Sequence, residues 1–467
     1  MKIYIVLFIT VLLAFTTKAQ NDLTFYHMGK ATPQANHLNP SFFPDSKVYV
    51  SLPAISGINL SLNNSFSYND VIVDVPGEDS VKLDIDNLLS KLKKGNNLNF
   101  STTISLLQVG VRLKDYGAIT FFANERAFAG MSYPVNLLEY AWRGSGDYVG
   151  KKLIEDEAKV NATYFREIGV GYAHQLEVLG SRKLRVGARI KLLQGISNIK
   201  TADDFSVSID TQEDNYHLNI AVDAPVIHTA GLEVDEDDID TYIMGNSNKG
   251  LGFDLGGELE LNDKINLSFA INDIGGITWK EEVVNYTANN TEIDFGGLDL
   301  KLLDDNDVTD ALEDSLKNKF DQVETSDSYS SKLSTRTFIG GTYQVFPRGM
   351  VSATISNNFI LGKPNTAFGI GYTHQFGKIL TLSTTIAKKP HQSPVIGGGF
   401  AARFGFFQLY TMVDDFIGYA DATSWQSSDV RFGINFLFGR KDKVKKAKSN
   451  KQESQDTTPE IETESGN

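Results

Sequence analysis

The sequence predicts an all-β fold, a transmembrane antiparallel β-barrel of about 14 strands with an N-terminal lumenal segment and short helices in its outer loops. Three observations support this prediction: an N-terminal secretion signal, a final strand with one apolar face, and a regular order of short and long connections. Together they indicate a secreted chain whose alternate side chains face lipid.

The first 19 residues have the pattern of a signal peptide. Met1 and Lys2 form a short basic region, residues 3–15 are apolar, and Ala19 ends a small-residue cleavage site. The apolar run is too short to span a membrane as a helix. The chain has no cysteine, which excludes a lipoprotein anchor and disulfides. We therefore expect a mature chain that begins at Gln20.

The last strand-like run, residues 430–438, alternates at period two. One predicted face carries Val430, Phe432, Ile434, Phe436 and Phe438. The run also has the form of the sorting signal of outer-membrane barrels, carried here by Arg431, Gly433, Phe436 and Phe438. We therefore expect the cell outer membrane of a Gram-negative bacterium, with membrane lipid and the barrel-assembly machinery as partners.

Alternation elsewhere predicts fourteen strands, at residues 47–60, 100–113, 117–124, 163–177, 183–198, 250–261, 264–273, 335–345, 349–360, 366–376, 379–389, 395–403, 407–414 and 429–438. Connections after even-numbered strands are a few residues long, and those after odd-numbered strands are longer. Short periplasmic turns and long outer loops are typical of outer-membrane barrels. A soluble β-protein is the less favoured interpretation.

The predicted inner face carries charges: Glu167, Arg185, Arg189, Lys191, Asp254, Glu258, Glu260, Arg336, Arg403 and Arg431. Ion pairs that brace the wall are the favoured interpretation, and a selectivity ring is the alternative. A net charge of −14 argues against nucleic acid as a partner. The repeated motif at residues 169–176 and 369–376 places two histidines alike, which we assign to the membrane interface rather than to a metal site.

Residues 20–46 precede the first strand and are long enough to return into the lumen as a plug. Prolines and aromatics make this segment stiff and adhesive, and the candidate plug residues are Phe25, Tyr26, Asn39, Pro40, Phe42 and Phe43. Residues 47–439 would form the barrel. Residues 440–467 are of low complexity and predict a disordered periplasmic tail.

The run Asn39-Pro40-Ser41, the N-terminal segment and the strand number resemble FadL-type transporters and the PorV-like barrels of type IX secretion. The phrases at residues 23–29, 38–44 and 63–70 also resemble an uncharacterised outer-membrane barrel family of Bacteroidota. The resemblance covers nearly the whole mature chain. It implies a place and a fold but no catalytic residues.

The outer loops contain three predicted helices, at residues 84–94, 134–142 and 307–323. Acidic runs at residues 234–240 and 304–307 lack the spacing of a calcium loop, so solvated surface is the favoured interpretation. Three triplets resemble O-glycosylation sequons of Bacteroidota, with Ser80, Ser315 and Thr457 as acceptors.

Two functions remain open from the sequence. The first is a passive transporter or channel for a hydrophobic or small solute, gated by the N-terminal segment. The second is a non-transporting barrel that docks envelope or type IX secretion partners. We expect no enzyme, cofactor or metal site, because no nucleophile, base and acid stand together. A continuous apolar path with a break in the wall would favour transport, whereas paired charges around a lumenal segment would favour docking.

Overall fold

The computed structural model describes residues 22–440, except 54, 56, 78, 94, 114–115, 179–181, 246, 297–318, 390–393, 417–422 and 425. The predicted signal peptide, the tail, Ser315, Thr457 and the acidic run 304–307 lie outside this range, as does most of the predicted helix 307–323. No helix within the described part is long and apolar enough to cross a membrane.

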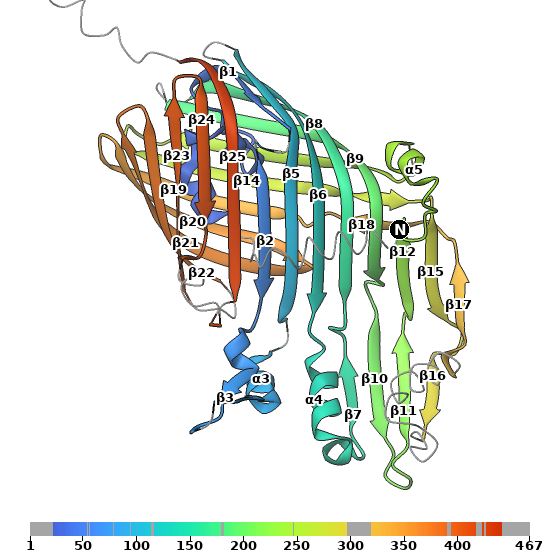
Figure 1. The fold of residues 1–467 in the computed structure, drawn as a ribbon. Helices are drawn as coiled ribbons and strands as arrows, with labels where there is room; N and C mark the ends of the chain where they lie inside the picture. Colours follow the sequence, from blue (N-terminus) through green and yellow to red (C-terminus); the bar gives the residue numbers. More distant parts are fainter. Residues whose placement is uncertain are drawn as a thin grey trace, which may run out of the picture.

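The wall is a closed ring of fourteen antiparallel positions (Figure 1). One position is a broken strand, β1 (Ser46–Ser51) followed by β2 (Ile58–Asn64). The other thirteen are β5 (Asn97–Leu113), β6 (Gly117–Ser132), β8 (Val160–Val178), β9 (Arg182–Thr201), β13 (Lys249–Glu260), β14 (Ile265–Trp279), β19 (Arg336–Phe346), β20 (Gly349–Ile360), β21 (Lys363–Phe376), β22 (Leu380–Lys388), β23 (Val395–Phe404), β24 (Phe407–Val413) and β25 (Ser427–Arg440).

The ring closes where the last strand meets the first. Val48 pairs with Phe438, and Leu60 pairs with Val430, so β25 runs antiparallel to both β1 and β2. Closure leaves the wall without an open edge, which a sheet in lipid requires. The predicted fold class is therefore confirmed, and a strand is found at each of the fourteen predicted places. The first is broken into β1 and β2, and β6 and β14 run on to Ser132 and Trp279, beyond their predicted ends at residues 124 and 273.

Alternation sorts the side chains between two environments. On β8 the outer residues Ile168 and Val170 are 43% and 49% exposed, whereas the preceding Glu167 is buried. The neighbouring strands repeat the pattern, with Ile190 and Phe253 outside and Lys191 and Asp254 inside. The outer face is therefore apolar, as a lipid-facing surface must be, and the charges turn inward.

The two ends of the barrel differ as predicted. Short turns join β5 to β6, β8 to β9 and β13 to β14 at one end, here called the short-turn end. The long connections meet at the other, the long-loop end, drawn at the bottom of Figure 1. There α3 (Ile85–Lys91) and α4 (Val135–Arg143) confirm two predicted helices. Asp84 caps α3 by accepting a hydrogen bond from the backbone N–H of Asn87 at 2.9 Å.

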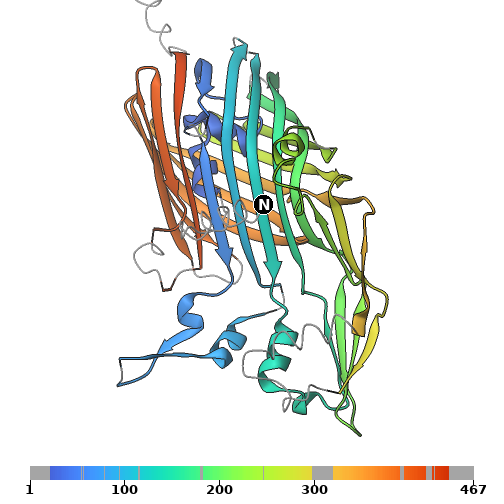
Figure 2. The same cartoon turned by 45° about the vertical axis from the view of Figure 1, so that its right-hand side comes forward.

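Short strands at the long-loop end were not predicted. A four-stranded sheet, here called the outer sheet, consists of β7 (Lys152–Glu155), β10 (Ser206–Thr211), β11 (Leu218–Asp223) and β16 (Glu292–Phe295). It projects beyond the ring (Figure 2). Nearby are β12 (Val226–Ala230), β15 (Val283–Ala288), β17 (Gln322–Thr325) and β18 (Tyr329–Lys332), and Ser80 lies between the hairpin strands β3 (Ile72–Asp74) and β4 (Val81–Leu83).

A further helix, α5 (Ile239–Gly245), was not predicted, because its first two residues belong to the acidic run 234–240, which was expected to be solvated surface. Its residues Ile239, Tyr242 and Ile243 pack against Tyr164 and Ile196 of the wall. The Tyr242 hydroxyl donates a hydrogen bond to the Ile196 carbonyl at 2.8 Å. The acidic run 234–240 therefore leads into a helix, and it forms no metal-binding group within the described residues.

Candidate functional site

The candidate site is the barrel lumen, which the N-terminal segment enters. This segment, residues 22–45, contains α2 (Leu23–Met28) and two short 3₁₀ turns, Gly29–Ala31 and Pro33–His37. It lies within the ring of strands, in dark blue in Figures 1 and 2. Every residue of α2 is buried, which an isolated six-residue helix in solution would not achieve. The wall therefore holds this helix in place.

Aromatic side chains of the segment pack against aromatic side chains of the wall. Phe25 stacks on Tyr410 of β24 with ring centroids 6.0 Å apart, and Tyr26 stacks on Phe338 of β19 at 4.9 Å. Phe42 lies against Tyr26 at 5.3 Å. These contacts form a buried cluster that also includes Met28, Leu38 and Met412. The segment and the wall therefore share one apolar core.

Hydrogen bonds complement the aromatic contacts. The His27 ring lies between two wall threonines, with Nδ1 3.1 Å from Thr385 Oγ1 and Nε2 3.0 Å from Thr354 Oγ1. The Gln34 amide donates to Asn435 Oδ1 of β25 at 2.6 Å. His27 and Gln34 therefore have partners on three strands, β20, β22 and β25, which help to define the position of the segment in the lumen.

Asn39 and Pro40 lie in a depression of the wall formed by β9, β13 and β14, here called the Asn39-Pro40 seat. The Asn39 amide donates to the Phe269 carbonyl at 3.1 Å and to the Gly257 carbonyl at 3.3 Å. A Cβ at Gly256 would overlap the Asn39 side chain, and one at Gly187 would overlap the Pro40 backbone. Glycine at these two wall positions therefore leaves the space that the Asn-Pro pair fills.

Beyond this seat, Phe43 is buried against Ala118 and Ala173. The Arg112 guanidinium lies over its ring, 4.7 Å from the centroid. The six candidate plug residues thus all lie buried inside the ring.

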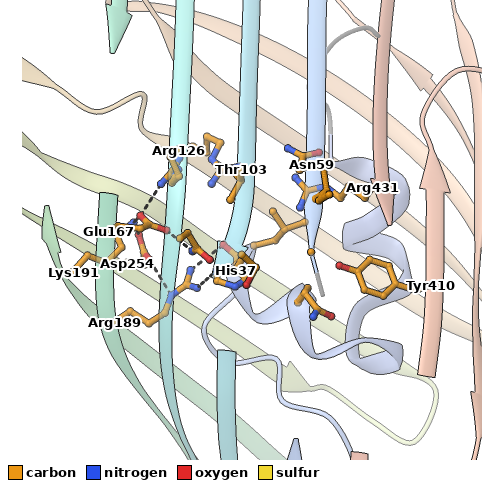
Figure 3. A pocket seen from close by; sticks show the side chains of 17 residues that line it. His37, Asn59, Thr103, Arg126, Glu167, Arg189, Lys191, Asp254, Tyr410 and Arg431 are labelled. Carbon is orange, nitrogen blue, oxygen red and sulfur yellow. Dashed lines mark hydrogen bonds and ion pairs between the residues drawn. The ribbon is translucent and has the colours of Figure 1, made fainter. Parts of the chain in front are cut away.

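Buried ion pairs lie in the lumen beside the segment, and Figure 3 shows those among Arg126, Glu167, Arg189, Lys191 and Asp254. Asp22 pairs with Arg431 of β25 and, at 3.0 Å, with Arg336 of β19. Arg336 also contacts Asp273 of β14 at 3.0 Å, and Asp273 accepts from Arg126 of β6 at 2.8 Å. A chain of alternating charges therefore links four wall strands through the first described residue of the segment.

The same network continues on β8, β9 and β13. Lys191 pairs with Asp273 and, at 2.8 Å, with Asp254, whose other oxygen lies 2.9 Å from Arg189 Nε. Glu167 accepts from Arg126 at 3.0 Å. We call the connected charges the lumenal network, formed by Asp22, Arg126, Glu167, Arg189, Lys191, Asp254, Asp273, Arg336 and Arg431.

A second ion cluster lies apart from the lumenal network. Arg185 contacts Glu258 at 2.6 Å and Glu260 at 2.7 Å, and Lys30 of the N-terminal segment also donates to Glu258 at 2.6 Å. Arg403 joins neither group, since its guanidinium donates to the carbonyls of Gly405 and Leu437. Nine of the ten charges predicted to face inward thus belong to one of the two clusters, and Arg403 is held by backbone carbonyls.

Three members of the lumenal network were not among the charges predicted to face inward. Asp22 lies just after the expected cleavage site, Arg126 lies beyond the end of the predicted strand 117–124, and Asp273 ends the predicted strand 264–273. Asp273 has a positive φ of 63°, at a place where the pairing register between β13 and β14 shifts. Extending the predicted strand 117–124 by two residues would have placed Arg126 on the inner face. No sequence pattern indicates that Asp22 belongs to the same network.

The four residues of the expected sorting signal occupy two faces of β25. Arg431 points into the lumen, and Gly433 pairs with Tyr410 across the ladder. Phe436 and Phe438 both stack on Phe406, with centroids 5.9 Å and 6.2 Å apart.

The repeated motif at residues 169–176 and 369–376 forms the same hydrogen bond in both copies. The Tyr172 hydroxyl lies 2.9 Å from His174 Nδ1, and the Tyr372 hydroxyl lies 2.8 Å from His374 Nδ1.

Cavities lie at the long-loop end of the barrel and beside the N-terminal segment. One of about 850 Å³ lies at the long-loop end, between Lys159, Lys200 and the β20–β21 turn. Another of about 260 Å³ lies between the segment and β14, β19 and β20. Smaller spaces of about 30 and 50 Å³ line the lumenal network between them. The two small spaces are lined mainly by polar or charged residues. A further cavity of about 720 Å³ is mainly apolar, with Ile168, Leu192 and Leu251 in its lining, and it shares Gly276 and Thr278 with the cavity of about 850 Å³.

Comparison with known proteins identifies a sequence family for this chain. Residues 40–414 match the sequence model of a family of unknown function, DUF5723. No curated protein matches the chain. Similar solved structures include the Ralstonia pickettii toluene transporter TbuX, with 10% identity, a TM-score of 0.42, and coverage of 91% of this chain and 100% of that chain.

Two further structures are similar. A Pseudomonas aeruginosa FadL homologue has 12% identity, a TM-score of 0.41 and coverage of 91% and 99%, in the same order. The Pseudomonas putida toluene transporter TodX has 10% identity, a TM-score of 0.36 and coverage of 90% and 93%. The closed wall and its apolar outer face make this chain an outer-membrane transmembrane β-barrel. By its sequence, the chain belongs to the DUF5723 family of unknown function.

Proposed function

We propose that this protein is an outer-membrane channel for a small solute, closed in the state described here by its own N-terminal segment. The observation that carries the proposal is the position of two cavities, one of about 850 Å³ at the long-loop end and one of about 260 Å³ beside the segment, with the lumenal network between them. The segment is not a wall strand, so its displacement would join these cavities without breaking the ring.

The lining narrows the class of solute. Paired charges and hydroxyl groups surround the spaces next to the lumenal network, so a hydrophobic solute would leave buried polar groups unsatisfied along its path. A small polar solute matches this surface better. The lining next to the lumenal network therefore favours the small-solute part of our expectation, whereas the apolar cavity of about 720 Å³ is the feature that favours the hydrophobic part.

Conductance in planar bilayers tests the proposal. Deletion of residues 20–38 removes α2, both 3₁₀ turns and the Asp22 carboxylate while leaving every wall strand in place. We expect wild-type protein to conduct rarely and the deletion variant to conduct steadily. Asp45→Asn is the matched control, because Asp45 lies at the end of the segment with an exposed side chain and should leave the lumen closed. Unchanged conductance of the deletion variant would contradict the channel.

Docking is a second candidate, favoured by a different observation. The lumen is occupied by paired charges and by the segment, which is the arrangement expected of a non-transporting barrel. The outer sheet projects beyond the ring and offers a surface for an envelope partner (Figure 2). A barrel that stays closed both with and without residues 20–38 would favour this function over the channel.

A further inference from the structure

The cavity of about 850 Å³ at the long-loop end carries charges that neither proposed function uses. Its lining comes from the start of β8, the end of β9, β14, β18 and the β20–β21 turn. Lysines supply three of its four charged groups, Lys159, Lys200 and Lys332, and Asp203 supplies the fourth. The cavity is therefore cationic, although the whole chain has a net charge of −14.

The three lysines gather around Asp203. Lys200 Nζ lies 2.9 Å from Asp203 Oδ1, and Lys159 Nζ donates to the Asp203 carbonyl. Burial alone would raise the pKa of the Asp203 carboxyl, but the hydrogen bond from Lys200 and the charges of Lys200, Lys332 and Lys159 lower it. The Asp203 side chain itself is 82% exposed, so it can turn toward solvent and leave the ammonium groups to another anion.

Lys332 is the least engaged of the three. Within the described part of the chain, its ammonium group forms no ion pair and no side-chain hydrogen bond, and the residue is exposed. Ser330 and Ser334 line the same cavity beside it. Ammonium and hydroxyl groups together form the donor set that phosphate and carboxylate oxygens require.

The cavity also leads inward. Asn161, Lys332 and Leu333 line both this cavity and the small space of about 30 Å³ that reaches Arg126 and Arg336. Cationic side chains therefore line a path from the cavity at the long-loop end, through Lys332, to Arg126 and Arg336 of the lumenal network. Arg126 and Arg336 already share Asp273, so the lysine group at the mouth is the part with unused donors.

We propose that this cavity binds a small organic anion with a phosphate or carboxylate group, held by Lys159, Lys200 and Lys332. The inference names the class of solute for the proposed channel and rests on that proposal. Acidic outer loops repel anions at long range, and a local cationic cavity offsets this repulsion where the solute enters. The bound anion would take over the donors that Asp203 now accepts from.

Calorimetric titration of the full mature chain in detergent, with inorganic phosphate as the probe, tests the site. We expect the triple variant Lys159→Gln, Lys200→Gln, Lys332→Gln to bind at least about tenfold more weakly, because charge-assisted hydrogen bonds are lost. Lys332→Gln alone is the second variant, since an exposed substitution preserves folding, and it should weaken binding about threefold. The matched control, Lys151→Gln, Lys152→Gln, Lys249→Gln, changes the net charge equally outside this cavity.

Equal affinity of wild type and both lysine variants would overturn the proposal, as would an equal loss in the control. Binding in detergent does not require an open lumen, so the two proposals fail separately. Lysine-dependent binding without conductance after deletion of residues 20–38 would refute the channel and leave the anion site standing. Conductance without phosphate binding would refute the anion site alone.

Discussion

Asp22 and Arg336 form an ion pair at 3.0 Å between the N-terminal segment and the wall strand β19, although 314 residues separate them in the chain. Asp22 also pairs with Arg431, and both arginines are largely buried. Asp22 therefore connects the N-terminal segment to two strands from the second half of the chain, β19 and β25, and helps to hold the segment inside the closed wall.

Asp22→Asn should loosen the segment without unfolding the wall. Loss of one buried charge leaves two guanidinium groups poorly compensated, which costs about 3–5 kcal/mol for a buried pair. We expect more frequent openings in planar bilayers and faster proteolysis near the N-terminus. Asp45→Asn, on an exposed side chain of the same segment, is the control. If both variants stay as closed as the wild type, Asp22 does not hold the segment.

Gly256→Ala should displace the Asn39-Pro40 seat. The new Cβ would overlap the Asn39 side chain, whose amide is held by two carbonyls, and overpacking of this kind costs about 1–3 kcal/mol. Gly257→Ala is a matched control on the adjacent residue, because its Cβ would meet nothing closer than 3.7 Å. Thermal unfolding should separate the two variants. Equal melting temperatures would show that the seat tolerates the added methyl group.

Asp273→Asn should destabilise the wall itself. Asp273 accepts from Arg126, Lys191 and Arg336, so it joins three cations from three strands. Asparagine tolerates the positive φ at this position as aspartate does, so the change isolates the charge. We expect a loss of about 3–5 kcal/mol in the free energy of unfolding, measured by urea titration in lipid vesicles. A loss comparable to that of Asp45→Asn would indicate that other carboxylates replace Asp273.

Ile190→Arg should test which surface meets lipid. Ile190 is 49% exposed in the middle of β9, where an arginine at the bilayer midplane costs about 2–4 kcal/mol. Ile154→Arg is the control, since Ile154 is 55% exposed on the outer sheet and should change the free energy of unfolding by less than about 1 kcal/mol. Similar effects at both positions would mean that the outer sheet also lies in the membrane.

The wall strands could be predicted because the alternation that identifies each of them lies within that strand's own sequence. A strand with lipid outside and a lumen inside alternates strictly, as Glu167, Ile168 and Val170 show, so period two identifies it without knowledge of its partners. The outer sheet could not be predicted in the same way. Its strands are four to six residues long, too short for alternation to stand out from a loop.

The inward-facing charges show which part of the lumen can be predicted from the sequence and which part cannot. It placed Glu167, Lys191 and Asp254 on the inner face, but their grouping into a lumenal network depends on which strands are neighbours and on the register between them. Asp22 shows the limit most clearly, because nothing near it in sequence indicates a partner on β19 or β25. Sequence alone determined the membrane barrel and the number of its strands, since lipid imposes a repeating local pattern. Only the tertiary structure decided what fills the lumen, because buried charges are satisfied by whichever distant partners the closed ring brings within hydrogen-bond distance.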